Sequence, residues 1–98
     1  MPKALISIII PFKNTERFLD ACLQSILQQT YIHWELLIID DSSSDRSTEI
    51  VQSYAESDSR IYLYSNDGNG IIEALQTGYK HAKGSFITRM DSDDIMTE

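Results

Sequence analysis

The sequence predicts an α/β protein of three layers, α/β/α, with a mostly parallel, Rossmann-like sheet in the middle. Four short runs of β-branched and aromatic residues alternate with three stretches in which apolar residues recur at helical spacing. Two of the runs are almost continuously apolar, as strands buried on both faces are. The pattern repeats at about thirty residues, the length of a βαβ crossover unit. Short strands alternating with amphipathic helices therefore favour helices on both faces of a parallel sheet.

The four expected strands cover residues 5–10, 34–39, 60–64 and 85–90. Proline lacks a backbone N–H, so we expect Pro11 to stop the first strand and residues 11–14 to form a loop. The third strand alternates isoleucine or leucine with tyrosine, which predicts that one face of the sheet is less deeply buried there.

Three amphipathic helices are expected between these strands. Asn14 or Thr15 can cap the first, and Ser44 or Asp45 can cap the second. We expect Gly84 to end the third as its left-handed C′ residue. The first helix has a broad apolar stripe of Phe18, Leu19, Cys22, Leu23, Ile26 and Leu27. Cys22 is the single cysteine of the chain, so no intrachain disulfide can form, and we expect it in the core.

Composition limits the function. The chain has 98 residues, the size of one small domain, and a formal net charge of −7 from 15 acids and 8 basic residues. Nucleic acid is excluded as the main partner because phosphate binding needs clustered cations. No apolar run is long enough to span a membrane. We expect a cytoplasmic protein, and association with the inner face of the membrane remains open.

Polar and acidic residues follow every expected strand. Parallel strands bring their carboxyl ends to one edge of a sheet, where α/β proteins bind ligands. In chain order the residues at this edge are Pro11, Phe12, Lys13 and Asn14; Asp40 and Asp41; Asn66, Asp67, Gly68 and Gly70; and Asp91, Asp93 and Asp94. The sequence therefore predicts a ligand site at this edge.

The acids after the fourth strand point to a divalent cation. Asp91 and Asp93 lie so close in sequence that their charges repel unless a positive group sits between them. Mg²⁺ or Mn²⁺ prefers such oxygen ligands and also binds phosphates. The alternative is a solvated acidic turn or a helix cap. No Gly-x-Gly-x-x-Gly follows the first strand, and the chain has no P-loop motif, so an ion is the expected phosphate partner. Asp40 and Asp41 could form a second metal site or accept hydrogen bonds from a base and a ribose.

Four segments together resemble family 2 glycosyltransferases with the GT-A fold. These segments are residues 7–14, 25–31, 34–45 and 91–94, and the resemblance runs from residue 5 to the end. It implies an inverting transfer from a nucleotide-diphosphate sugar, most readily a UDP-sugar, to an acceptor hydroxyl.

The resemblance also implies roles for single residues. Pro11 and its neighbours Phe12 and Asn14 match the part that lines the base pocket through main-chain groups. Asp41 matches the acid that contacts the base, with Asp40 beside it. Asp91 and Asp93 match the Asp-x-Asp motif, with Asp93 the direct metal ligand and Asp91 near the ribose and sugar. Whether Asp40, Asp45 or Asp94 touches ligand stays open.

Two departures from the family pattern bear on these roles. Residues 74–76 read Ala-Leu-Gln where the family often has Ala-Arg-Asn, so an arginine contact to the nucleotide is missing, and Lys13 or Arg89 could replace it. The family's acceptor half and general base lie beyond the matched region. We therefore expect residues 1–98 to be the N-terminal, nucleotide-sugar-binding part of a longer GT-A domain, inactive by itself.

Two other classes of protein would carry different residues after the first strand. A metal-dependent nucleotidyltransferase would carry a loop rich in glycine and arginine after the first strand, and a phospho-acceptor receiver module would carry its acidic pair there. A binding-only fragment stays open as an alternative. An incomplete GT-A sheet would expose apolar surface, around Ile71, Ile72 and Leu75 or around Phe86 and Ile87, so we expect a homodimer.

Overall fold

The computed structural model of the chain describes residues 4–13, 16–29, 33–41, 46–66, 68 and 70–90. Its strands and helices alternate strictly along the sequence. They are β1 (Ile6–Phe12), α1 (Glu16–Leu27), β2 (Trp34–Asp40), α2 (Ser47–Ser57), β3 (Ile61–Ser65), α3 (Ile71–His81) and β4 (Phe86–Arg89).

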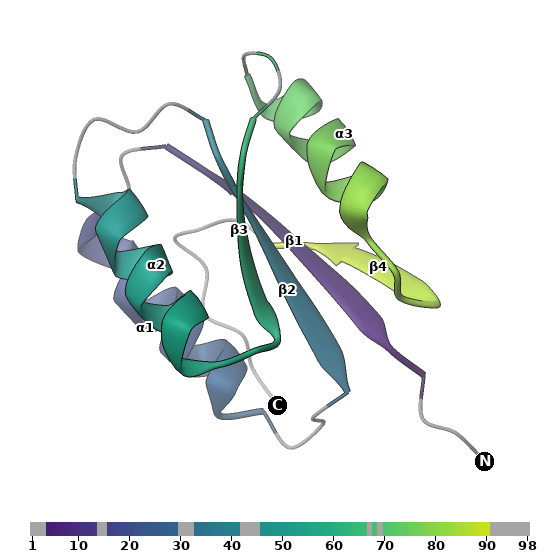
Figure 1. The fold of residues 1–98 in the computed structure, drawn as a ribbon, viewed down its shortest axis with the longest axis horizontal. Coiled ribbons are helices and arrows are strands. Elements are labelled where there is room, and N and C mark those ends of the chain that lie inside the picture. Colours follow the sequence, from purple (N-terminus) through teal and green to yellow (C-terminus); the bar gives the residue numbers. More distant parts are fainter. Residues whose placement is uncertain are drawn as a thin grey trace.

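The strands form one parallel sheet in the order β3-β2-β1-β4. Helices α1 and α2 lie on one side of this sheet and α3 lies on the other, as Figure 1 shows. The predicted three-layer α/β/α fold is therefore confirmed. The chain moves outward from β1 through β2 to β3, and then crosses by α3 to the opposite side of β1. The strand order thus reverses between β1 and β4, which is where open α/β sheets bind ligands.

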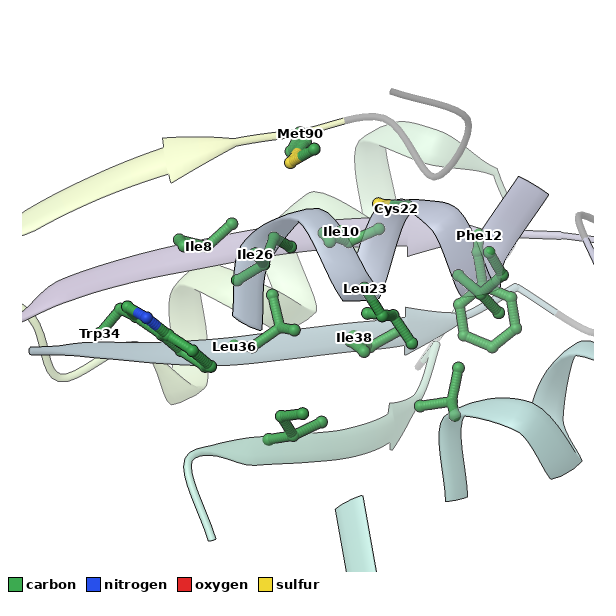
Figure 2. Packing of buried hydrophobic residues seen from close by; sticks show 13 residues of the cluster. Ile8, Ile10, Phe12, Cys22, Leu23, Ile26, Trp34, Leu36, Ile38 and Met90 are labelled. Atoms are coloured by element: carbon green, nitrogen blue, oxygen red, sulfur yellow. The ribbon is translucent and has the colours of Figure 1, made fainter. Parts of the chain in front are cut away.

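The larger part of the core lies between the sheet and the pair α1 and α2. Figure 2 shows Ile8, Ile10 and Phe12 of β1 on the same side of the sheet as Leu36 and Ile38 of β2. Cys22, Leu23 and Ile26 of α1 pack against them, and each of these three is fully buried. Alternate residues of a strand point to opposite faces. The even-numbered residues of β1 and β2 therefore lie in this core, and the odd-numbered residues lie on the other face of the sheet. The prediction that Cys22 is a core residue is confirmed.

A smaller core lies beneath α3. Ile9 of β1 and Leu37 and Ile39 of β2 pack there against Ala74. Helix α3 approaches β1 closely at Gly78, where a Cβ atom would lie 2.5 Å from Cγ2 of Ile9. Glycine at this position therefore permits the distance between α3 and the sheet.

The prediction that Pro11 ends the first strand is wrong, because β1 continues through Pro11 to Phe12. The main-chain groups of Phe12 face β2, since its carbonyl accepts a hydrogen bond of 2.8 Å from the N–H of Asp41. The main-chain groups of Ile9 face β4, since the Ile9 carbonyl accepts a hydrogen bond from the N–H of Met90. Pro11 is two residues after Ile9, so its main-chain groups face the β4 side as well. β4 is paired with β1 only as far as Ile9. The missing N–H of Pro11 thus points to where no ladder bond is required.

Two predicted helix ends are also wrong. Helix α2 begins at Ser47 with Arg46 in the N-cap position, one residue after Asp45 and two residues after Ser44. Helix α3 ends with an extended residue, Ala82, at its C-cap. Gly84 is not a left-handed C′ residue, because Gly70 is the only described glycine with positive φ. Gly84 instead comes so near to β1 that a Cβ atom would lie 2.6 Å from the carbonyl oxygen of Leu5.

A buried polar cluster explains this close approach. The Ser7 hydroxyl donates a hydrogen bond of 2.6 Å to Oε2 of Glu35 and accepts one of 2.8 Å from the N–H of Gly84. The N–H of Lys83 donates to the same Glu35 oxygen at 2.7 Å. Both side chains are buried, with Ser7 fully inaccessible and Glu35 6% exposed. These three hydrogen bonds fix the segment that leads from α3 into β4.

The alternation predicted for the third strand is confirmed. Ile61 is buried, whereas Tyr62 on the opposite face is 39% exposed. Among the described residues, no helix is both long and apolar enough to cross a membrane.

Candidate nucleotide-sugar site

The carboxyl ends of three strands are tied together by main-chain hydrogen bonds. Phe12 of β1 is in register with Asp40 of β2, and the Phe12 carbonyl accepts from the N–H of Asp41 at 2.8 Å. The Asp40 carbonyl accepts from the N–H of Asn66, directly after β3, at 2.9 Å. The predicted gathering of polar residues at this edge is therefore present for the first three strands.

Asp41 is the centre of the side-chain network at this edge. Its Oδ1 accepts a hydrogen bond of 2.9 Å from the amide nitrogen of Asn66 and one of 3.2 Å from the N–H of Gly70. Gly70 is the N-cap of α3 and has a φ of 90°, a conformation that L side chains rarely adopt. The positive end of the α3 dipole and its first orphan N–H groups thus lie beside the carboxylate of Asp41.

Asn66 holds the loop between β3 and α3 in place. Its amide nitrogen also donates to the Gly70 carbonyl at 3.1 Å. Its Oδ1 accepts from the N–H of Gly68 at 3.2 Å and lies 3.5 Å from the hydroxyl of Thr77, a buried residue of α3. The two sides of one amide therefore join Asp41, the loop and the helix, which fixes the orientation of the Asp41 carboxylate.

Asp40 is held separately. Its Oδ2 accepts a hydrogen bond of 2.9 Å from the hydroxyl of Thr48 in the first turn of α2. Asp40 and Asp41 are adjacent in sequence, so their side chains leave the strand toward opposite faces of the sheet. The Asp40 carboxylate therefore contacts α2, and the Asp41 carboxylate contacts the N-cap of α3. Among the described residues no group of three or more His, Cys, Asp or Glu side chains could hold a metal ion.

The other predicted site residues fall into two groups. Pro11 and Phe12 are described and buried, and the Phe12 side chain is part of the core, so only its main chain can face a ligand. Asn14, Asp91 and Asp93 lie outside the described residues, as do Asp45 and Asp94. Met90, the residue before Asp91, donates its N–H to the Ile9 carbonyl at 3.0 Å, which fixes the end of β4 beside β1. The ligand roles of all these residues stay predictions.

Sequence reasoning placed Asn66 and Gly70 at this edge but gave neither a role in the site, and it did not consider Thr77. The signal was present, because an Asn that ends an alternating strand and precedes two glycines favours a hydrogen-bonded loop. The partner of its amide could not be read from the sequence, since Asp41 lies 25 residues earlier.

Comparison with known proteins identifies the family. The model of the family described as glycosyl transferase family 2 matches residues 7–98. WfgD from Escherichia coli, a UDP-Glc:alpha-D-GlcNAc-diphosphoundecaprenol beta-1,3-glucosyltransferase, is 46% identical over 97% of the chain. The glycosyltransferase GlyG from Streptococcus pneumoniae is 40% identical over 96% of it. The chain spans 37% of WfgD and 32% of GlyG, so it corresponds to about a third of these relatives.

Solved structures agree with this result. TarS from S. aureus in complex with UDP-GlcNAc superposes with a TM-score of 0.84 and 28% identity over 92% of the chain and 27% of TarS. The mannosyltransferase PcManGT from Pyrobaculum calidifontis, in complex with GDP-Man and Mn²⁺, superposes with a TM-score of 0.83 and 25% identity, over 92% of the chain and 28% of that protein. The family match covers nearly the whole sequence, and these structural neighbours share its parallel sheet. The chain belongs to glycosyltransferase family 2 and has the GT-A fold.

Proposed function

We propose that this chain is the donor-binding half of an inverting glycosyltransferase and that it binds a nucleotide-diphosphate sugar together with a divalent cation. The observation that carries the proposal is the network around Asp41 at the carboxyl edge of a family 2 sheet, next to the reversal of strand order. The complexes of TarS with UDP-GlcNAc and of PcManGT with GDP-Man support a nucleotide-sugar as the ligand. They leave the base open, because both uracil and guanine nucleotides occur on this fold.

In this proposal Asp41 accepts a hydrogen bond from the base, and the main chain around Pro11, Phe12 and Asn14 borders the base. We assign Asp40 and Asp91 to contacts with the ribose. The carboxylate of Asp41 is already oriented by Asn66 and Gly70, so no side-chain entropy needs to be lost there when the nucleotide binds. Lys13 and Arg89, both exposed near the ends of β1 and β4, are the described cations that can stand in for the arginine missing from α3.

Asp91 and Asp93 would hold the cation, Mg²⁺ or Mn²⁺. Their carboxylate oxygens suit a hard ion, and β4 is held beside β1 by the Met90 hydrogen bond immediately before them. The Mn²⁺ in the PcManGT complex supports a divalent ion in this fold. When bound, the ion supplies Lewis-acid stabilisation of the charge on the departing diphosphate.

The whole activity needs more than these residues. An acceptor hydroxyl must lose its proton to a general base as it attacks the anomeric carbon on the face opposite the diphosphate. The chain spans about a third of its relatives, so we propose that the base and the acceptor site belong to the part of such enzymes that this chain does not match. We expect residues 1–98 alone to bind donor without transferring sugar. The lipid-linked acceptor in the name of WfgD supports a cytoplasmic site at the inner face of the membrane.

Metal removal tests the proposal. Calorimetric titration of the chain with UDP should give binding in Mn²⁺ and much weaker binding in excess chelator, because the like charges of the diphosphate and of Asp91 and Asp93 then face each other without a cation. Asp93→Asn should lower the affinity in Mn²⁺ to the level seen in chelator. Gln52→Ala, which removes an exposed amide from α2, is the control and should behave as the wild type.

The base contact is tested separately with uridine, which has no phosphate and needs no cation. Asp41→Ala should weaken uridine binding with and without metal, while Asp93→Asn should leave it unchanged. Equal UDP binding in metal and in chelator would overturn the metal role. Undiminished uridine binding by Asp41→Ala would overturn the base contact.

A further inference from the structure

We propose that Asn66 is a specificity-determining residue that restricts the site to bases with a single N–H donor on the Watson–Crick edge, such as uracil or thymine, by occupying one oxygen of Asp41. This inference rests on the proposed function, in which Asp41 receives the base. It concerns a question that the fold leaves open, namely which nucleotide is selected.

The argument begins with the lone pairs of the Asp41 carboxylate. Each carboxylate oxygen can accept about two hydrogen bonds. Oδ1 already accepts two, from the Asn66 amide at 2.9 Å and from the Gly70 N–H at 3.2 Å. No described residue donates to Oδ2. Asp41 is half-buried, and within the described part of the chain a ligand therefore meets a carboxylate with one oxygen available and the other filled.

The bases differ in what they offer to such a group. The Watson–Crick edge of guanine carries two parallel donors, N1–H and N2–H, which match both oxygens of a free carboxylate. Uracil and thymine carry one donor, N3–H, between two carbonyl groups. With Oδ1 filled, guanine can satisfy only one of its two donors, and the other is desolvated without a partner. Uracil loses nothing, because a single oxygen is all that its edge requires.

The position of Asn66 makes this restriction rigid. Its amide is held from both sides, by the Gly70 carbonyl at 3.1 Å and by the Gly68 N–H at 3.2 Å. Thr77 lies 3.5 Å from the amide oxygen and is itself buried on α3, with its hydroxyl donating to the Glu73 carbonyl at 3.0 Å. To release Oδ1 for guanine, the whole turn between β3 and α3 would have to rearrange. A donor of guanine that is desolvated without a partner should lower its affinity by about tenfold or more.

The test compares UDP, GDP and IDP on the wild-type chain in Mn²⁺ by calorimetry. IDP has the guanine ring N1–H without the N2 amine, so it separates the size of a purine from its second donor. We expect UDP to bind about tenfold or more tightly than GDP, and IDP to bind more tightly than GDP. Asn66→Ala opens one of the two acceptor positions of Oδ1, while the Gly70 N–H keeps the other, and should lower the ratio of UDP to GDP affinity by about tenfold. Gln52→Ala, with its amide on the exposed side of α2, should leave this ratio unchanged.

The possible results distinguish a failure of this inference from a failure of the proposed function. If UDP and GDP bind the wild type equally, if GDP binds as tightly as IDP, or if Asn66→Ala keeps the wild-type ratio, the restriction by Asn66 is wrong while the proposed function stands. If none of the three nucleotides binds in Mn²⁺, the proposed function is wrong and this inference falls with it. The comparison of IDP with GDP needs no variant, so it holds even if Asn66→Ala does not fold.

Discussion

At the scale of single residues, the most consequential side chain outside the proposed site is Ser7. Its hydroxyl accepts the hydrogen bond from the Gly84 N–H, and it also donates to the buried Glu35 carboxylate. Ser7→Ala removes both bonds and leaves a desolvated N–H and a less satisfied carboxylate. We expect a loss of about 1–3 kcal/mol in the free energy of unfolding, measured by urea denaturation.

Ser53→Ala is the matched control for this change. Ser53 is exposed on α2, and its substitution should alter the free energy of unfolding by no more than about 0.5 kcal/mol. If Ser7→Ala were as mild as the control, the buried cluster would contribute no net stability. The segment between α3 and β4 would then have to be fixed by the main-chain bonds of Ser85 and Phe86 to Leu5.

The sequence predicts which edge of the sheet carries the acids, but it does not predict their hydrogen-bond partners. The acids at the strand ends could be placed because strand polarity alone puts them at one edge. The partners of Asp41 and Glu35 could not, since each depends on contacts between segments 25 to 48 residues apart. Hydrogen bonds of this kind follow from tertiary packing and leave no local pattern.

At the scale of elements, the contact between α3 and β1 limits what Gly78 can become. Gly78→Ala places a Cβ atom 2.5 Å from Cγ2 of Ile9, which is 1% exposed and has little room to move. Overpacking of this kind costs about 1–3 kcal/mol, and it exceeds the gain of about 1 kcal/mol that alanine brings to a helix interior. We therefore expect a lower melting temperature for Gly78→Ala, measured by circular dichroism.

A double-mutant cycle shows whether the clash is the cause. Ile9→Ala removes Cγ2 and leaves a cavity that the new methyl group partly fills. Gly78→Ala should therefore be less harmful, or stabilising, in the Ile9→Ala background than in the wild type. Additive effects of the two substitutions would contradict the clash.

The same element scale shows which features of the fold can be read from a sequence. The order and type of the seven elements in the described part of the chain were predicted, because long amphipathic stripes and apolar strands carry strong periodic signals. The errors fall at the ends. Pro11 is compatible with β1 only because β4 is already unpaired there, and Gly84 serves a close approach to Leu5. Both depend on a neighbouring strand, which local propensity does not describe.

At the scale of the whole molecule, the sheet is unevenly covered. β4 lies at one edge, and Figure 1 shows no strand beyond it in the described part of the chain. Phe86 on β4 is 63% exposed and Ile87 is 45% exposed. On α3, Ile72 is 70% exposed and Tyr79 is 53% exposed. The predicted apolar exposure is confirmed for Ile71, Ile72, Phe86 and Ile87. It is wrong for Leu75, which is half-buried and packs against the smaller core, and association through these elements stays a prediction.

We expect the chain to self-associate through the edge of β4, as a two-fold dimer, because an open strand edge flanked by apolar side chains can pair with a second copy. The net charge of −7 opposes this contact, and salt screens the repulsion without weakening apolar burial. Light scattering should therefore give a mass that rises with protein concentration and rises further at high salt.

Ile87→Lys puts a charge on the edge strand and should restore the monomer, whereas Ile72→Lys on α3 should not. A monomeric mass throughout the concentration series would contradict the dimer. Restoration of the monomer by Ile72→Lys alone would transfer the contact from the strand edge to α3, where no main-chain pairing is available and packing of side chains would have to hold the two copies together.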